Sequence, residues 1–498
     1  MIKFFIDQHG CAKNQTDGEL ITGYLSKKGF ELTLNADEAD FILINTCGFI
    51  ESAKKESIDA VYSVKAAYPN AKIIMTGCLA QRYAQDLYEQ MPELDGVFGN
   101  GDLSKIADFM QSVLAGKRDV QTYDQKGICE TARPVLFNFK GSAFVKITEG
   151  CSNHCSFCAI PLIRGELRSR KMENVIAEIK ELIASGVYEI NLIGQDLAAY
   201  GTGVDDGEIR AEVERFCLSA GVNQSGVQNE KSACTLSPLA VLLSKISALE
   251  GEFLVRLLYI HPDHFNTDIL DIMQKDSRFA RYFDIPFQSG DDKIIRAMNR
   301  TGSFEKYTKL IKTIRECLPG CMLRTTFLTG FPGETDECAE NTQKFQQAIK
   351  PDWSGCFPFS REEDTPAYKM KNRVPKKVAQ KRAELLENAQ QELTAKRLES
   401  FVGQNFDVLV EEIIENNAEI SEDSSEGLAI GRTWFQAPEV DGCVVIRYDL
   451  DSKEEAGAVV SGNVVKVQIL AVTGVDLDGR FTGLVKEFKK ADSLTFLR

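Results

Sequence analysis

The stretch Cys151-Ser-Asn-His-Cys155-Ser-Phe-Cys158 decides how this chain is interpreted, because it brings three cysteines together within eight residues. Three thiolates at this spacing can hold three irons of a cubic iron–sulfur cluster, and the fourth iron then stays open to a small molecule. A structural zinc site is the alternative, but it needs a fourth ligand, and His154 inside the run is poorly placed to join the same tetrahedron. A redox-active cluster therefore explains the run better than a zinc site or a disulfide knot.

Apolar strand cores alternate with helical segments around this run. The predicted strands are Phe144–Ile147, Glu189–Ile193, Leu254–Tyr259, Tyr282–Pro286, Leu323–Leu328 and Trp353–Phe357. Six such units are typical of a partial (βα)6 TIM-like barrel, whose chemistry gathers at the C-terminal ends of its strands. The cysteine run follows the first strand directly. We place this α/β barrel at residues 137–372, with a surface insertion at about 204–236 that shows no apolar core.

Residues 1–120 repeat the alternation and predict a separate doubly wound α/β domain. Its predicted strands include Ile2–Ile6, Phe41–Asn45 and Lys72–Met75. Cys11, Cys47 and Cys78 each lie at or just past the C-terminal end of one of these strands. Because ligands bind at that edge of an open parallel sheet, the three thiols are expected to converge on a second cluster. Three buried structural thiols are the alternative, since cysteine is common in protein cores.

The last quarter of the chain changes character. Residues 373–400 are rich in charge and predict a solvated linking helix. Residues 401–490 switch to apolar runs of period two, which are typical of a small antiparallel β-barrel. These runs are Phe406–Val410, Gly442–Arg447, Val464–Leu470 and Phe481–Val485.

Composition narrows the class of protein. The chain has 498 residues, 14 cysteines and a net charge of −15. Its N-terminal residues show no signal-peptide pattern, so we expect reduced, metal-binding cysteines and a cytoplasmic location rather than disulfides. No apolar run of about 18 residues occurs, so no membrane span is expected. The negative charge disfavours bulk attraction to nucleic acid and suits a basic partner, although it also serves solubility.

Taken together, these motifs resemble the methylthiotransferase branch of the radical S-adenosylmethionine (SAM) superfamily over nearly the whole chain. The matching motifs are Gly10-Cys-Ala-Lys-Asn14, Asn45-Thr-Cys-Gly-Phe-Ile50, Thr76-Gly-Cys78, Glu149-Gly-Cys151 through Cys158, Gln195-Asp196, Asp284-Ile-Pro286, Met298-Asn-Arg300 and Gly330-Phe-Pro-Gly-Glu-Thr335. Residues 401–490 stand where the family carries a TRAM domain. The resemblance implies two 4Fe–4S clusters, the first held by Cys151, Cys155 and Cys158 and the second by Cys11, Cys47 and Cys78.

The resemblance also implies a reaction. In this family the first cluster binds and cleaves SAM, the resulting radical takes a hydrogen from the substrate carbon, and the second cluster presents the sulfur. Arg164, Gln195 and Arg324, placed at the predicted barrel mouth, are candidate SAM contacts, and each could equally be a structural ion pair or loop anchor. An electron donor such as flavodoxin or ferredoxin is implied as a partner.

Two substrate classes remain open within the branch. RimO-like members modify the β-carbon of an aspartate in the twelfth small-subunit ribosomal protein, and MiaB-like members modify isopentenyl-adenosine in tRNA. Lys13-Asn14 and Ala437–Gly442 are similar to the ribosomal-protein type. Residues 401–498 hold 18 Asp/Glu and 9 Lys/Arg, a net charge of −9, which suits a basic ribosomal protein better than tRNA.

We expect Glu439 and Asp441 to be among the charges that meet this partner. A non-enzymatic iron–sulfur or zinc scaffold that binds ribosomes or RNA is the alternative from another class.

Overall fold

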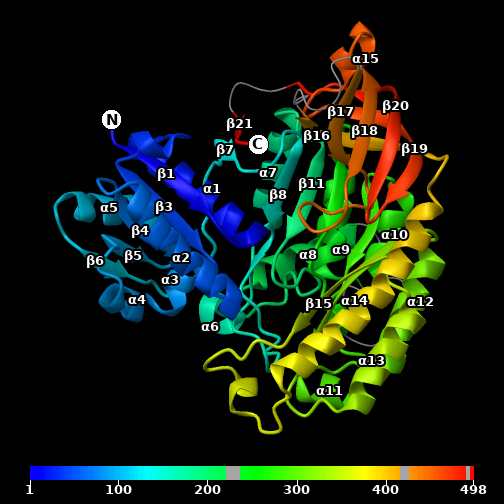
Figure 1. Ribbon diagram of the computed structural model, residues 1–498, viewed down its shortest axis with the longest axis horizontal. Coiled ribbons are helices and arrows are strands. Elements are labelled where there is room, and N and C mark those ends of the chain that lie inside the picture. Colours follow the sequence, from blue (N-terminus) through cyan, green and yellow to red (C-terminus); the bar gives the residue numbers. More distant parts are fainter. Residues whose placement is uncertain (220–235, 415–424, 490–493) are drawn as a thin grey trace.

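The computed structural model describes residues 1–219, 236–414, 425–489 and 494–498, which form three parts in chain order (Figure 1). The N-terminal part is a fully parallel six-stranded sheet with the order β2-β1-β3-β4-β5-β6. Its strands are β1 (Lys3–Gln8), β2 (Glu31–Leu32), β3 (Phe41–Thr46), β4 (Lys72–Gly77), β5 (Gly96–Phe98) and β6 (Asp119–Gln121). Every residue of β3 is buried, as the continuous apolar sequence of a central parallel strand predicts.

Helices cover both faces of this sheet, which confirms the doubly wound prediction. They are α1 (Ala12–Lys27), α2 (Glu51–Ala67), α3 (Cys78–Arg82), α4 (Ala84–Gln90) and α5 (Ile106–Leu114). Apolar residues of α1 and α5 pack on one face, and those of α2, α3 and α4 pack on the other. This arrangement leaves the C-terminal edge of the sheet open toward the rest of the molecule.

The central part is the predicted partial barrel. Its six parallel strands follow chain order across the sheet, from β8 at one edge to β15 at the other. The strands are β8 (Ser142–Lys146), β11 (Glu189–Ile193), β12 (Leu254–Leu257), β13 (Phe279–Asp284), β14 (Met322–Thr329) and β15 (Trp353–Pro358). The helices outside them are α7 (Met172–Ala184), α8 (Gly207–Ser219), α9 (Pro238–Ser247), α10 (Asp268–Lys275), α11 (Asp292–Ala297), α12 (Phe304–Cys317) and α13 (Asp336–Ile349).

The segment 204–236 differs from the expected surface loop in its first half. Residues 207–219 form helix α8, and its Ile209, Val213 and Cys217 are buried in the core of the barrel. These apolar residues recur every fourth position, a helical period that the surrounding charged residues obscured in the sequence. The rest of the segment, residues 220–235, lies outside the described residues.

The charged linking helix is also more buried than predicted. Helix α14 (Lys376–Glu399) runs along the outside of β14 and β15 (Figure 1). Its Ala379, Ala383 and Leu386 are buried there, whereas most of its charged residues remain exposed.

Among the described residues, no helix combines the length and the apolar character needed to cross a membrane.

The C-terminal part is a closed five-stranded barrel, which confirms the all-β prediction. Its strands are β16 (Asn405–Ile414), β17 (Glu426–Arg432), β18 (Val444–Asp449), β19 (Val464–Thr473) and β20 (Asp476–Lys486), with the short helix α15 (Lys453–Ala458) between β18 and β19. Strand β17 was not predicted, because its two glycines weaken a strand signal. The β18–β20 pair is parallel, so the barrel is not wholly antiparallel as expected.

A buried ion network fixes this small barrel to the base of the central one. Arg432 of β17 donates hydrogen bonds to both carboxylate oxygens of Glu189, at 3.0 and 2.7 Å, and to Glu411 at 2.7 Å. Arg256 of β12 donates to Glu189 as well, at 2.8 Å. Because Glu189 begins β11, the two barrels are locked together at the end opposite the predicted chemistry.

Candidate active site between two cysteine trios

The first group of thiols, here the barrel trio, consists of Cys151, Cys155 and Cys158. It lies on the loop between β9 (Thr148–Glu149) and α6 (Ile160–Arg164), just beyond β8. Burial raises the pKa values of Cys151 and Cys158 to about 12, and the neighbouring thiols add to the rise. Cys155 is buried, and Cys151 and Cys158 are half-buried. Because coordination removes the proton of a thiol, three thiols on one such loop fit a metal cluster.

His154 does not approach these sulfurs. Its backbone has φ of 47°, and its side chain is 58% exposed with Nε2 3.5 Å from Glu166. The zinc alternative with His154 as fourth ligand therefore has no support from the geometry.

The second group, here the sheet trio, consists of Cys11, Cys47 and Cys78. Cys11 precedes α1, Cys47 follows β3, and Cys78 begins α3 after β4, so all three stand at one edge of the sheet. Burial raises the pKa of Cys78 to about 12, and the nearby Cys11 and Cys47 add to the rise while Arg164 opposes it. The three widely spaced thiols are thus close enough to influence one another.

Glycines beside the sheet trio allow this close approach. A Cβ atom added at Gly48 would lie 2.9 Å from the carbonyl carbon of Cys78, and one at Gly10 would lie 3.1 Å from the Cβ of Cys47. Larger residues would push the three loops apart. The residues present therefore fit the second cluster that the sequence predicted.

Arg164, a predicted SAM contact, lies between the two trios. Its guanidinium donates to Glu149 and Asp17, both at 2.8 Å, and lies 3.3 Å from the Cys78 sulfur. Lys146 reaches the same two carboxylates at 2.5 Å each. Burial by itself would raise the pKa of Glu149, but Lys146 and Arg164 hold it well below its ordinary value. Since Asp17 belongs to the sheet domain and Glu149 to the barrel, this network joins the sheet domain to the segment that leads into Cys151.

The other two predicted SAM contacts have different surroundings. Gln195 follows β11, and both polar atoms of its amide are buried with no hydrogen-bond partner in the described part of the chain. Such atoms normally find a partner, so Gln195 fits a polar ligand bound at the barrel mouth. Arg324 of β14 instead pairs with Asp441, its Nη1 lying 2.6 Å from Oδ1.

Asp441 corrects the expectation of a partner-facing charge. Its side chain is 0% exposed, because it also accepts hydrogen bonds from the hydroxyl of Tyr282 at 2.6 Å and the amide of Ala437 at 2.8 Å. The acidic loop that carries it is folded against the inside of the central barrel. Glu439 alone of the two predicted charges is on the surface, where it pairs with Arg498 at 2.6 Å.

The sequence interpretation missed His261, whose side chain lies beside the barrel trio. The Nε2 atom of His261 lies 3.7 Å from the sulfur of Cys155. The amide of Asp263 donates to Nδ1 at 3.2 Å, so Nδ1 is unprotonated and Nε2 carries the ring hydrogen that faces the sulfur. His261 and His264 directly follow a barrel strand in a chain with only four histidines, which was a signal available in the sequence.

His261, His264 and Asp196 also lie close enough together to be compared with a cation site. Both oxygens of Asp196 are already engaged, one by Nδ1 of His264 at 2.7 Å and the other by the His261 amide at 3.1 Å. The carboxylate therefore anchors the histidine loop without needing an ion.

Lys13 and Tyr259 form a second unpredicted contact. Lys13 lies in the first turn of α1, and its Nζ sits 3.0 Å from the centroid of the Tyr259 ring, which projects from the end of β12. The contact crosses from the sheet domain to the barrel mouth. Burial lowers the pKa of Lys13.

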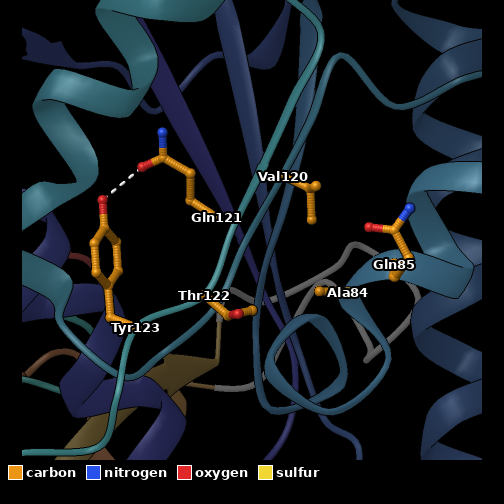
Figure 2. Close-up of a pocket in the computed structure, with 6 residues that line it drawn as sticks. All are labelled: Ala84, Gln85, Val120, Gln121, Thr122 and Tyr123. Carbon is orange, nitrogen blue, oxygen red and sulfur yellow. Dashed lines mark hydrogen bonds between the residues drawn. The ribbon is translucent and has the colours of Figure 1, made fainter.

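A shallow pocket elsewhere takes no part in this arrangement. It lies at the β6 edge of the N-terminal sheet, and Figure 2 shows its lining residues, Ala84, Gln85, Val120, Gln121, Thr122 and Tyr123. The cysteines of the sheet trio follow β1, β3 and β4 instead, and none of them lines this pocket.

Three family profiles match consecutive parts of the chain. Residues 3–99 match the uncharacterized protein family UPF0004, residues 145–345 match the radical SAM superfamily, and residues 402–481 match the TRAM domain. The three matches follow the three structural parts in order.

Curated relatives of similar length align with nearly the whole chain. The ribosomal protein uS12 methylthiotransferase RimO of Treponema denticola is 49% identical over 95% of this chain and 99% of its own. The enzyme of the same name from Natranaerobius thermophilus is 35% identical over 95% of this chain and 97% of its own. Among solved structures, the radical SAM methyltransferase TsrM of Kitasatospora setae aligns with a TM-score of 0.50 at 14% identity over 74% of each chain, a likeness of fold.

Proposed function

This chain belongs to the ribosomal protein uS12 methylthiotransferase (RimO) family of radical SAM enzymes, and we propose that it adds a methylthio group to the β-carbon of an aspartate in uS12. The arrangement of the two cysteine trios supports this proposal. They stand on facing loops of the sheet domain and the barrel, and Arg164 contacts both Cys78 and Glu149, two residues before Cys151. A reaction that needs two clusters and one substrate carbon requires such a shared space.

The chain's own residues divide the work. We infer that the barrel trio and the sheet trio each hold one of the two 4Fe–4S clusters, and that Gln195 contacts SAM. When bound, these groups supply the electron, the radical and the sulfur. The protein positions them, because the Arg164 network ties the sheet domain beside Cys78 to Glu149, two residues before Cys151. Arg324 shapes the inside of the barrel through Asp441.

The substrate is a protein rather than RNA. The relatives described above are uS12 enzymes, so modification of tRNA by a MiaB-like reaction is not favoured, and neither is a non-enzymatic scaffold. The net charge of −9 over residues 401–498 suits a basic ribosomal protein. We further propose flavodoxin or ferredoxin as electron donor, and the cytoplasm, where ribosomal proteins are assembled, as the location.

The test is a reconstituted reaction. The protein is loaded anaerobically with iron and sulfide and incubated with SAM, a reductant and a uS12 peptide. Mass spectrometry should show the gain of one methylthio group in place of one hydrogen on the target aspartate. Isopentenyl-adenosine tRNA replaces the peptide in a parallel reaction. Product in tRNA with none in the peptide would contradict the proposal.

A further inference from the structure

One stretch of the chain reverses its overall charge. Residues 369–381, here the basic segment, lead from β15 into the first turns of α14. These 13 residues contain six cations and no acidic residue, whereas the whole chain has a net charge of −15. The cations are Lys369, Lys371, Arg373, Lys376, Lys377 and Lys381. A local field of one sign attracts a partner of the opposite sign.

The charge of the basic segment is available to such a partner. All six cationic residues are exposed, and within the described residues none of them pairs with a carboxylate. The next cation, Arg382, differs because it is buried and pairs with Glu334 at 2.7 Å and Asp336 at 2.6 Å. Two exposed acidic residues, Glu363 and Asp364, precede the segment and are too few to cancel six cations.

The basic segment begins beside the loop of the barrel trio. Just before it, the amide of Ala367 donates to the carbonyl of Ser156 in that loop at 2.8 Å. Met370 of the segment and Phe157 of the loop pack on the same apolar cluster. Figure 1 shows the segment, in yellow, at the end of the barrel where α6 continues the loop. A protein bound to the segment therefore lies next to the barrel trio.

The sheet domain meets the same region through other residues. Cys78 of the sheet trio packs against Ala159 and Ile163, beyond the last cysteine of the loop. The contacts of the basic segment are with residues 156 and 157 instead. A partner on the basic segment therefore leaves the space between the two trios to SAM and the substrate.

We propose that the basic segment is the docking surface for an acidic electron-carrier protein that reduces the cluster of the barrel trio. The inference rests on the proposed function and names the surface on which its electron donor binds. One electron passes from the reduced carrier to the oxidised cluster, so the carrier is oxidised by one electron and the cluster is reduced by one. No bond forms or breaks at the docking surface.

Other charged partners fit this surface less well. The substrate uS12 is a basic protein in this proposal, and six cations repel it. Sites for single-stranded RNA combine cations with aromatic side chains on which bases stack, and the basic segment contains no aromatic residue. An acidic carrier needs only the opposite charge and a place close to the cluster.

The experiment measures binding to the anaerobic, cluster-loaded enzyme, so it does not depend on turnover. A fluorescent acidic flavodoxin and, separately, a fluorescent acidic ferredoxin are titrated by anisotropy at low salt and at about 1 M salt. A triple variant combines Lys371→Gln, Arg373→Gln and Lys376→Gln. It should bind the carrier about tenfold more weakly at low salt, because three exposed ion pairs are lost. At about 1 M salt, where charges are screened within ~3 Å, the wild type and the variant should agree.

A second triple variant is the matched control. It removes the same charge from three exposed lysines of the sheet domain, Lys28, Lys105 and Lys117, and should bind the carrier as the wild type does. Reduction of the cluster by the bound carrier should slow about tenfold in the first variant only. Reduction by dithionite, which needs no docking surface, should be the same in all three proteins.

Several outcomes would overturn this role. A wild type that binds neither carrier, or binds one with no dependence on salt, excludes an electrostatic docking surface. Equal weakening in the two triple variants shows that net charge matters and the position does not. If a ribosomal RNA fragment binds the wild type and is lost from the first variant while both carriers fail to bind, the basic segment binds RNA instead. Failure of the proposed function is seen separately, as absence of methylthio product when dithionite supplies the electron.

Discussion

Replacing Arg164 with methionine should uncouple cleavage of SAM from formation of the methylthio product. The guanidinium contacts Asp17 and Asn14 of the sheet domain, at 2.8 and 2.7 Å, and Glu149 of the barrel at 2.8 Å. Methionine fills much of the space and removes all three contacts. The sheet domain and the barrel would then lose a side chain that contacts both.

The free-energy cost of this change depends on the ion pairs that remain after Arg164 is removed. Removing one partner of a buried ion pair costs about 3–5 kcal/mol. Lys146 continues to neutralise both Asp17 and Glu149, so the lower value, about 3 kcal/mol, is expected. If this cost falls on the contact between the domains, their separation becomes about a hundredfold more frequent.

Hydrogen exchange measures this opening directly. Amides at the start of α1 and in the loop 148–165 should exchange about a hundredfold faster in Arg164→Met. Formation of 5′-deoxyadenosine should persist, while the methylthio product falls. Arg168→Met is the matched control, because the hydrogen bonds of Arg168 within the described residues go to backbone carbonyls, those of Gly127, Glu166 and Arg164.

Two results would refute this reasoning. Unchanged exchange with normal product would show that the network does not hold the domains together. Unchanged exchange with loss of SAM cleavage would instead support Arg164 as the SAM contact that the sequence predicted.

Three further changes test other parts of the site. Cys47→Ala should lower the iron content from about eight to about four per chain while SAM cleavage continues; a full yield of methylthio product would remove Cys47 from the ligands. His261→Leu removes the ring N–H that lies 3.7 Å from the sulfur of Cys155. A donor to a cluster sulfur favours the reduced form of the cluster. If its removal weakens that form tenfold, the one-electron potential should fall by about 59 mV in a redox titration followed by electron paramagnetic resonance. An unchanged potential would contradict the contact. Arg432→Met leaves Glu189 with one cation fewer and should weaken docking of the C-terminal barrel by about 3 kcal/mol. The first unfolding transition should then occur at a lower urea concentration, and a single transition at the wild-type midpoint would argue against this role.

The sequence by itself determined the fold class and the family. Apolar runs such as Phe41–Thr46 have the length and continuity of buried parallel strands, and their regular alternation with helices leaves few topologies. Cys151 to Cys158 could be identified because their ligand spacing is local. The cysteines of the sheet trio could be grouped because each follows a strand of the same sheet. Local signals of this kind can be recognised in the sequence without a structure.

Tertiary structure decided which partner each charged side chain takes. Arg164 and Arg324 both looked like SAM contacts, yet one lies beside Cys78 and the other is paired with Asp441. Asp441 looked like a surface charge and is buried beneath Tyr282. No period or motif records such pairs, because their members are far apart in the chain, by 117 residues for Arg324 and Asp441 and by 159 for Tyr282 and Asp441. The energy of a charged side chain depends on neighbours that only folding brings together, and for that reason the contact between Lys13 and Tyr259 became visible only in three dimensions.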